Sequence, residues 1–191
     1  NQLDDIHRLP MVEILIPALR QMSADQHDQF IGIIDELIFA DDHITLFEFC
    51  LEKLLYHRLE PDIQQHASRA PDFHSITPLQ KDVVVLLSHL AYVGHATKKE
   101  AHAAFDRGQQ CLLNRDLVEA SDLLPKNRCG YDALETALNR IGNSSSGVKQ
   151  QIVDAVAHVV LADEEVTVEE AEILRAICEV IDVPLPPFLP S

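Results

Sequence analysis

Apolar residues recur along most of this chain at spacings of three and four, which is the period of an amphipathic α-helix. The spacing predicts helices over 10–22, 23–40, 45–57, 77–94, 97–113, 131–141, 148–161 and 168–181. We expect the first of these to be short or kinked at Pro17, because proline lacks a backbone N–H. No segment keeps the period-two alternation of a half-buried strand. The pattern therefore predicts an all-α fold, a bundle of packed helices.

The most hydrophobic run of the chain extends from Val83 to Val93 and follows the helix-start signal Thr77-Pro-Leu-Gln. We expect this run to form a central buried helix that is closed by Gly94. Residues 117–124 continue, less regularly, the helical pattern of 111–113. We therefore expect helix there as well, up to the break at 125–130.

The remaining segments predict connections. Residues 1–9 are polar and predict a linker, 58–76 contain Pro61 and Pro71 and predict a connector, and 183–191 form a proline-rich tail. Residues 10–182 are then assigned to a single helical domain.

A nine-residue acidic turn occurs twice, as ADDHITLFE at 40–48 and as ADEEVTVEE at 162–170. Each copy ends in Thr-x-x-Glu, the capping box that starts a helix. The Thr hydroxyl accepts from the backbone N–H three residues on, and the Glu carboxylate accepts from the Thr N–H. Ser23 with Gln26 and Thr97 with Glu100 carry the same signal. Each acidic turn predicts one helix, a sharp turn and a second helix.

The two acidic turns and their flanking helices align at an offset of 122 positions. Five identities result: Gln29 with Gln151, Ala40 with Ala162, Asp41 with Asp163, Thr45 with Thr167, and Glu48 with Glu170. The apolar stripes also correspond, for example Ile34 with Val156 and Leu51 with Ile173. The sequence predicts an internal duplication, with halves at about 23–57 and 146–182.

Composition narrows the range of partners. The 191 residues carry a net charge of −16, which repels nucleic acid and anionic lipid and attracts cations or basic protein surfaces. A purely solubilising role for this charge is the alternative. Aromatic residues make up only 5% and Trp is absent, so the core must consist of Leu, Ile, Val and Ala. The four cysteines lack any Cys-x-x-Cys pair and predict reduced thiols.

Targeting signals and membrane spans are absent from the sequence. It contains no signal peptide and no apolar run near the roughly 18 residues of a membrane span. The chain begins at Asn1 rather than Met, which would fit a fragment of a longer protein.

Catalytic motifs are missing as well. The ten histidines include no His-Glu-x-x-His and no pair spaced by four, so one helix cannot present two histidine ligands on one face. Gly-x-Ser-x-Gly, a P-loop and Gly-x-Gly-x-x-Gly do not occur. The sequence predicts a chain that is not itself an enzyme.

The acidic turns are the one candidate metal site. Carboxylate oxygens are suitable ligands for a hard cation such as Ca²⁺. The candidate ligands are Asp41, Asp42, Glu48, Asp163, Glu164 and Glu170. The spacing differs from that of an EF-hand, and Glu48 and Glu170 are also the capping residues of the following helices. We therefore favour helix capping over metal binding for these carboxylates.

The repeated Ala-Asp-x-x-(Ile/Val)-Thr-x-x-Glu element, flanked by apolar helices, resembles the TerB-like (tellurite-resistance type) all-helical fold. That family typically has Ala-Asp-Gly at this turn, whereas this chain has Asp42 or Glu164 in place of Gly. The departure argues against carrying a metal site over from the family.

Other segments resemble the C-terminal region of bacterial membrane zinc metallopeptidases of the HtpX or CAAX prenyl protease type. They are VKQQIVDAVAHVVLAD (148–163), LRAI (174–177), PLPPFL (184–189), LRQMS (19–23), DELI (35–38) and LFEF (46–49). The resemblance implies a non-catalytic, soluble regulatory or partner-binding domain, with the zinc and its His-Glu-x-x-His in an upstream peptidase domain.

The resemblance also implies where the chain acts and with what. The partner would be another protein or the parent's own membrane and peptidase domains. The location would be cytoplasmic, tethered to the inner membrane through upstream segments, with no cofactor in this chain. The alternative function is a cation-sensing module that uses the two acidic turns.

Overall fold

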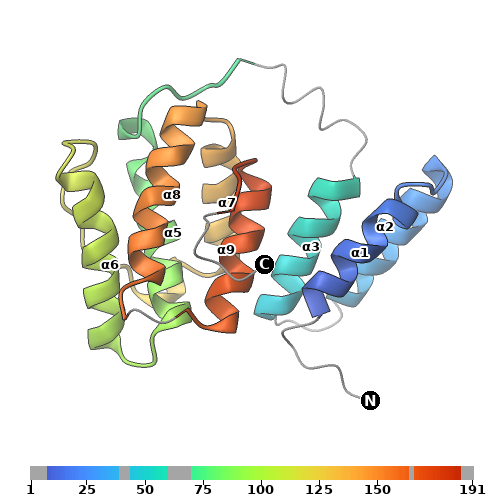
Figure 1. Ribbon diagram of the computed structural model, residues 1–191, viewed down its shortest axis with the longest axis horizontal. Helices are drawn as coiled ribbons and strands as arrows, with labels where there is room; N and C mark the ends of the chain where they lie inside the picture. Colours follow the sequence, from blue (N-terminus) through green and yellow to red (C-terminus); the bar gives the residue numbers. More distant parts are fainter. Residues whose placement is uncertain (1–7, 39–43, 60–69, 164–165, 186–191) are drawn as a thin grey trace. The chain divides into compact units, whose positions relative to one another are not determined.

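The computed structural model describes residues 8–38, 44–59, 70–163 and 166–185, and this part of the chain is helical with no β-strand. The chain divides into two compact units, an N-terminal unit of residues 1–69 and a C-terminal unit of residues 70–191. Figure 1 shows the helices of each unit. The predicted all-α fold class is confirmed.

Three helices form the described part of the N-terminal unit. They are α1 (Arg8–Leu19), α2 (Ala24–Ile38) and α3 (Leu46–Leu59). Both α1 and α2 pack on α3. Pro17 lies inside α1 near its C-terminal end, and the helix ends two residues later.

A small apolar core holds these helices together. Ile16 of α1 is buried with Leu55 and Leu59 of α3, and partly buried side chains surround them. The surrounding residues are Val12, Leu19, Met22, Phe30, Ile31, Ile34 and Leu51. Burying such side chains contributes about 1.5–3 kcal/mol each.

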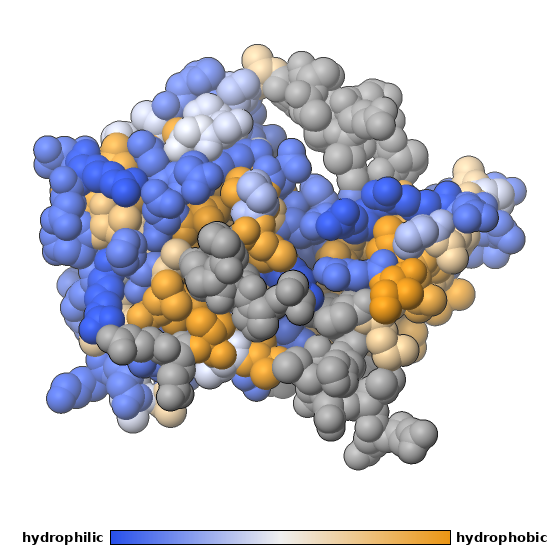
Figure 2. Space-filling view, viewed as in Figure 1, coloured by the Kyte–Doolittle hydropathy of each residue, from blue (hydrophilic) through white to orange (hydrophobic). Residues whose placement is uncertain are grey.

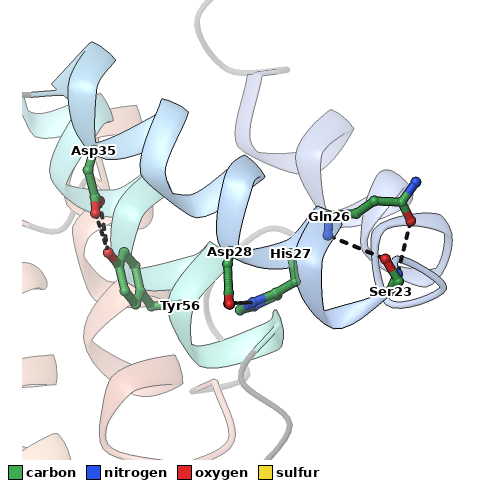
Figure 3. Close-up of polar contacts among 6 residues, drawn as sticks. All are labelled: Ser23, Gln26, His27, Asp28, Asp35 and Tyr56. Atoms are coloured by element: carbon green, nitrogen blue, oxygen red, sulfur yellow. Dashed lines mark hydrogen bonds and ion pairs between the residues drawn. The ribbon is translucent and has the colours of Figure 1, made fainter.

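Polar contacts join the same three helices. The Tyr56 hydroxyl of α3 lies 2.8 Å from both carboxylate oxygens of Asp35 on α2 (Figure 3). Arg20 Nε donates to the carbonyl of Arg58 at 2.8 Å and so satisfies one of the free carbonyls at the end of α3.

In the described part of the C-terminal unit, a short 3₁₀ turn, η2 (Thr77–Leu79), precedes five α-helices. They are α5 (Gln80–Gly94), α6 (Lys98–Leu113), α7 (Tyr131–Gly142), α8 (Ser146–Val160) and α9 (Val168–Val180), with the 3₁₀ turn η3 (Lys126–Arg128) before α7. The helix predicted to start at Thr77 thus starts at Gln80, after the 3₁₀ turn.

Helix α5 is the centre of this unit, as predicted. It packs against α6, α7, α8 and α9 (Figure 1). Its side chains Val83, Leu86, Leu87 and Leu90 are at most 1% exposed. Helices α6 and α8 also approach closely at Gly108, where an added β-carbon would lie 2.9 Å from the carbonyl oxygen of Ala155.

The prediction of helix over 117–124 is wrong. Helix α6 ends at Leu113, and Asp116 adopts the left-handed conformation with φ of 52°. The chain then bends at Val118 and runs from Glu119 to Pro125 without helix, turn or bend. We call residues 119–125 the extended segment. The left-handed residue ends the helix, as is common at helix C-termini.

The two acidic turns belong to different units, the first to the N-terminal and the second to the C-terminal one. The internal duplication and the single domain over 10–182 stay predictions. Within the described ranges, no helix is both long and apolar enough to cross a membrane.

Candidate functional site

All four predicted capping boxes form. In each, the first side chain accepts from the backbone N–H three residues on, and the second accepts from the backbone N–H of the first. The pairs are Ser23 with Gln26, Thr45 with Glu48, Thr97 with Glu100, and Thr167 with Glu170. Figure 3 shows the Ser23–Gln26 pair. Each box satisfies two of the free N–H groups at a helix start.

Glu48 is the described candidate ligand of the first acidic turn. Its Oε2 accepts from the Thr45 N–H at 2.7 Å, and its own N–H donates to the Thr45 hydroxyl at 3.3 Å. Asp41 and Asp42 lie outside the described residues. The carboxylate of Glu48 therefore has a structural role at the start of α3.

Glu170 of the second acidic turn is completely buried. Its Oε2 accepts from both the N–H and the hydroxyl of Thr167, each at 2.9 Å. Its Oε1 is also buried, makes no hydrogen bond within the described part of the chain, and lies where a β-carbon of Gly94 would be. The carboxylate thus points into the unit, against the end of α5.

The other candidate ligands do not join Glu170. Asp163 is exposed in the turn after α8, and Glu164 lies outside the described residues. Among residues 8–38, 44–59, 70–163 and 166–185, no three His, Cys, Asp or Glu side chains are grouped as a metal site requires. The cation site stays a prediction, because three of its six candidate ligands are not described.

His89 is the one buried histidine of the described residues, and sequence reasoning placed it only among scattered histidines. Its Nδ1 lies 2.7 Å from the carbonyl oxygen of Cys129, and its ring lies 5.0 Å from that of Tyr131. Because a carbonyl only accepts, Nδ1 carries the proton of the neutral ring. Burial lowers the pKa of His89. The position of His89 within the most hydrophobic run of the sequence was the signal that could have predicted its burial.

An exposed apolar face lies on the first two helices. On α1, Met11, Ile14 and Leu15 are spaced i, i+3 and i+4 and are 43%, 77% and 53% exposed. On α2, Ile33 and Leu37 are one turn apart and are 57% and 64% exposed. Figure 2 shows hydrophobic residues gathered on the surface of these helices. We call these five residues the apolar face.

Helix α1 carries apolar side chains on two sides. One side, with Val12 and Ile16, packs in the core of the N-terminal unit, whereas Ile14 and Leu15 on the other side are exposed. A helix that is apolar all round is normally covered all round. Clusters of exposed large apolar residues mark surfaces that bind another molecule.

Acidic residues accompany the apolar face. Asp25, Asp28 and Glu36 of α2 are all exposed. The carboxylate of Asp28 lies 3.3 Å from Nδ1 of His27 (Figure 3). A partner with basic groups around an apolar surface would therefore be complementary to this side of α2.

In the C-terminal unit, a cavity of about 1070 Å³ lies between α5 and the extended segment. Val84, Val85 and Leu124 form its apolar part. Its charged lining consists of Lys81, Asp82, Glu119, Asp122, Arg128 and Arg140. Opposite charges mix here, so the lining does not select a small ion of either sign.

No family model, no curated protein and no solved structure matches this chain. The functional conclusion therefore depends on the surfaces of the chain itself.

Proposed function

We propose that this chain is a non-catalytic partner-binding region, and that its apolar face is the binding surface. The observation that carries the proposal is the exposure of five large apolar side chains on α1 and α2, between 43% and 77%. Covering such side chains removes apolar area from water, at about 25 cal/mol per Å².

A protein surface is the occupant that fits these helices best. The net charge of −16 and the exposed carboxylates of α2 disfavour an anionic lipid surface. The described part of α1 lacks the Lys- and Arg-rich polar face of helices that lie on membranes. An apolar protein surface with basic groups around it would be complementary both to the exposed apolar side chains and to the exposed carboxylates of α2.

We further propose that the partner is the peptidase domain of a membrane-anchored zinc metalloendopeptidase to which this chain belongs. The resemblance of 148–163, 174–177 and 184–189 to the C-terminal region of such enzymes supports this assignment. On this proposal the zinc and the proteolytic residues lie upstream, and this TerB-like, internally duplicated region regulates them from the cytoplasmic side of the inner membrane.

The parent is tested by its coding sequence. We expect transmembrane helices and His-Glu-x-x-His upstream of residue 1. If neither is encoded there, the metallopeptidase part of the proposal fails, while the apolar face can still be tested against other proteins.

The apolar face is tested by photo-crosslinking in the full-length protein. A photoreactive amino acid in place of Ile14 should crosslink to a peptide of the parent's peptidase domain, identified by mass spectrometry. The matched control carries the same amino acid at Gly32, which is exposed on a different side of α2 from Ile33 and Leu37 and has open space for a side chain. Crosslinks to lipid alone, or equal crosslinking from both positions, would contradict the proposed binding surface.

A functional variant complements the crosslinks. Replacing both Ile14 and Leu37 by Gln removes apolar surface without adding charge. We expect this variant to fold normally, since both residues are mainly exposed, and to lose regulation of zinc-dependent proteolysis. Gly32→Ala, on a different side of α2, should leave proteolysis unchanged.

A further inference from the structure

Helix α1 exposes an unbroken apolar row. The exposed residues within 11–19 are all apolar, and they are Met11, Ile14, Leu15, Pro17 and Ala18. Four of them, at positions 11, 14, 15 and 18, follow the spacing i, i+3, i+4 and i+7, which places them on one side of the helix. At 1.5 Å per residue this row is about 10 Å long. It therefore runs along two turns of a helix of 12 residues.

The main chain beneath the apolar face offers a partner no row of hydrogen bonds. The N–H and C=O groups of α1 and α2 are bonded within each helix, apart from those at the helix ends and at Pro17. A partner must therefore bind this face through its side chains. An extended peptide or a loop lying on these apolar side chains would bury its own N–H and C=O groups without partners, which is costly. An α-helix avoids this cost because its main chain is bonded internally.

The spacing of the exposed side chains also fits a helix. Residues three and four apart form ridges on a helix surface, and these ridges pack into the grooves of a second helix. Ile33 and Leu37 form a further, shorter row on α2. Both α1 and α2 pack on α3, so a partner helix would be the fourth helix of a small bundle.

A carboxylate borders the apolar face. Glu36 is exposed and lies three residues after Ile33, so the two side chains are neighbours on the surface of α2. Glu36 forms no ion pair within the described ranges. A cation on the partner beside Glu36 would therefore be complementary to this edge.

We propose that the partner covers the apolar face with one amphipathic α-helix, whose flank beside Glu36 carries Lys or Arg. This inference rests on the proposed function and adds the kind of element that the partner contributes. Binding would follow the mode in which an amphipathic helix places its apolar side on an apolar surface, with anchors at i, i+3, i+4 and i+7.

Other occupants fit less well. A second copy would bring together two chains that each carry a net charge of −16, and it would place acidic residues of both copies near one interface. Anionic lipid would be repelled by the same charge. A partner helix with a basic flank avoids both kinds of repulsion.

The first test maps crosslinks in the full-length protein. A photoreactive amino acid replaces Met11, Ile14, Leu15 or Ile33, one at a time, and the crosslinked residues are identified by mass spectrometry. We expect these residues to lie in one segment of the peptidase domain at spacings of three, four and seven. Crosslinks to that domain at spacings of two, or over several segments, would overturn the helix and leave the proposed function intact. Absence of crosslinks to that domain would contradict the proposed function, and model peptides then decide whether the face binds a helix.

The model peptide is acetyl-Lys-Leu-Gln-Ala-Leu-Leu-Gln-Lys-Leu-Gln-Ala-Leu-Leu-Gln-Lys-amide, and it is titrated into the full 191-residue chain. As a helix it has one stripe of Leu with all Lys residues along one flank. We expect it to shift the methyl signals of Ile14, Leu15 and Ile33. The control peptide has two central Leu residues in the D form, which keeps composition and charge but disfavours the right-handed helix. It should bind about tenfold more weakly. Equal binding of the two peptides, or no shift of these methyl signals, would overturn the proposal.

A matched pair of variants tests the basic flank. Glu36→Gln should weaken binding of the Lys peptide about threefold, and it should not change binding of a peptide with Gln in place of each Lys. Asp116→Asn changes the net charge by the same amount in the C-terminal unit, and asparagine tolerates the left-handed conformation found there. This variant should bind like the wild type. Equal weakening in both variants would contradict a specific contact at Glu36. Self-association in sedimentation that is lost in Ile14→Gln would make a second copy the occupant.

Discussion

The carboxylate of Glu170 occupies the space that a side chain at Gly94 would need. A β-carbon built on Gly94 would overlap Oε1 of Glu170, and the next side-chain carbon atoms are also within 3.0 Å. Gly94 ends α5, yet its φ is not positive, so the reason for glycine here is close approach rather than a left-handed turn. The contact joins the start of α9 to the end of α5.

Gly94→Ala should therefore destabilise the C-terminal unit. Overpacking of this kind costs about 1–3 kcal/mol. Gly147→Ala is the matched control, because a β-carbon there meets nothing within 4 Å, and it should raise stability by up to about 1 kcal/mol. Hydrogen exchange of the α5 core amides measures both effects in this unit.

A double-mutant cycle tests whether overlap with the Glu170 side chain causes the loss of stability in Gly94→Ala. Glu170→Ala alone loses the capping box, at a cost of about 1 kcal/mol. If the overlap is the cause, Gly94→Ala should cost much less in the Glu170→Ala background. Additive losses would show that Gly94 and Glu170 act independently.

Protonation of His89 should destabilise the fold. Burial lowers its pKa from the ordinary 6.5, although the bond to the Cys129 carbonyl acts in the opposite direction. Between the folded and the unfolded pKa, the unfolded chain binds more protons, so the free energy of unfolding falls as the pH drops below about 6.5. Protonated Nε2 would be a buried donor without an acceptor among the described residues.

This loss of stability is measured by denaturant unfolding of the C-terminal unit between pH 7.5 and 5. His89→Gln, which keeps a donor for the Cys129 carbonyl, should flatten the dependence. His158→Gln, at an exposed position of α8, should leave it as in the wild type. The same pH dependence in His89→Gln would assign it to other groups.

The carboxyl group of Glu100 should titrate at an unusually low pH. Hydrogen bonds from Thr97 lower its pKa below the ordinary 4.5, and the bond from the hydroxyl contributes more than the bond from the N–H. Stability from this box is present above about pH 4.5 and is lost as the pH falls through the folded pKa.

Carbon-detected NMR titration measures the Glu100 pKa directly. Thr97→Ala should raise it toward the ordinary value, whereas Thr97→Ser keeps the hydroxyl and should leave it low. An unchanged pKa in Thr97→Ala would show that the side-chain bond is not the cause.

The sequence was sufficient to predict those features that depend on residues close together in the chain. A capping box joins residues three positions apart, so Thr45 with Glu48 and Thr167 with Glu170 could be predicted from spacing alone. The central α5 followed from the length of its apolar run.

The sequence alone could not predict features that depend on contacts between residues far apart in the chain. The extended conformation at Ser121 depends on Gln109, twelve positions away on another helix, and the apolar pattern of 117–124 gave no sign of it. The exposure of the apolar face could not be predicted either, because Ile33 and Leu37 continue the same helical stripe as the core residues Phe30 and Ile34. Periodicity shows which side of a helix is apolar, but it does not show which of the apolar residues are buried against other helices.

Gln109 therefore provides the last prediction. Its side chain bonds to both main-chain groups of Ser121, and it is 6% exposed. Gln109→Ala would leave two main-chain groups unpaired at a partly buried site, which costs about 1–3 kcal/mol. Gln110→Ala is the matched control, because Gln110 is exposed on the same helix and its side chain bonds to the neighbouring Asn114. It should change stability by less than about 0.5 kcal/mol. Faster hydrogen exchange at Ser121 in Gln109→Ala, but not in Gln110→Ala, would confirm that the side-chain amide holds the segment extended, and equal exchange in the two variants would show that it does not.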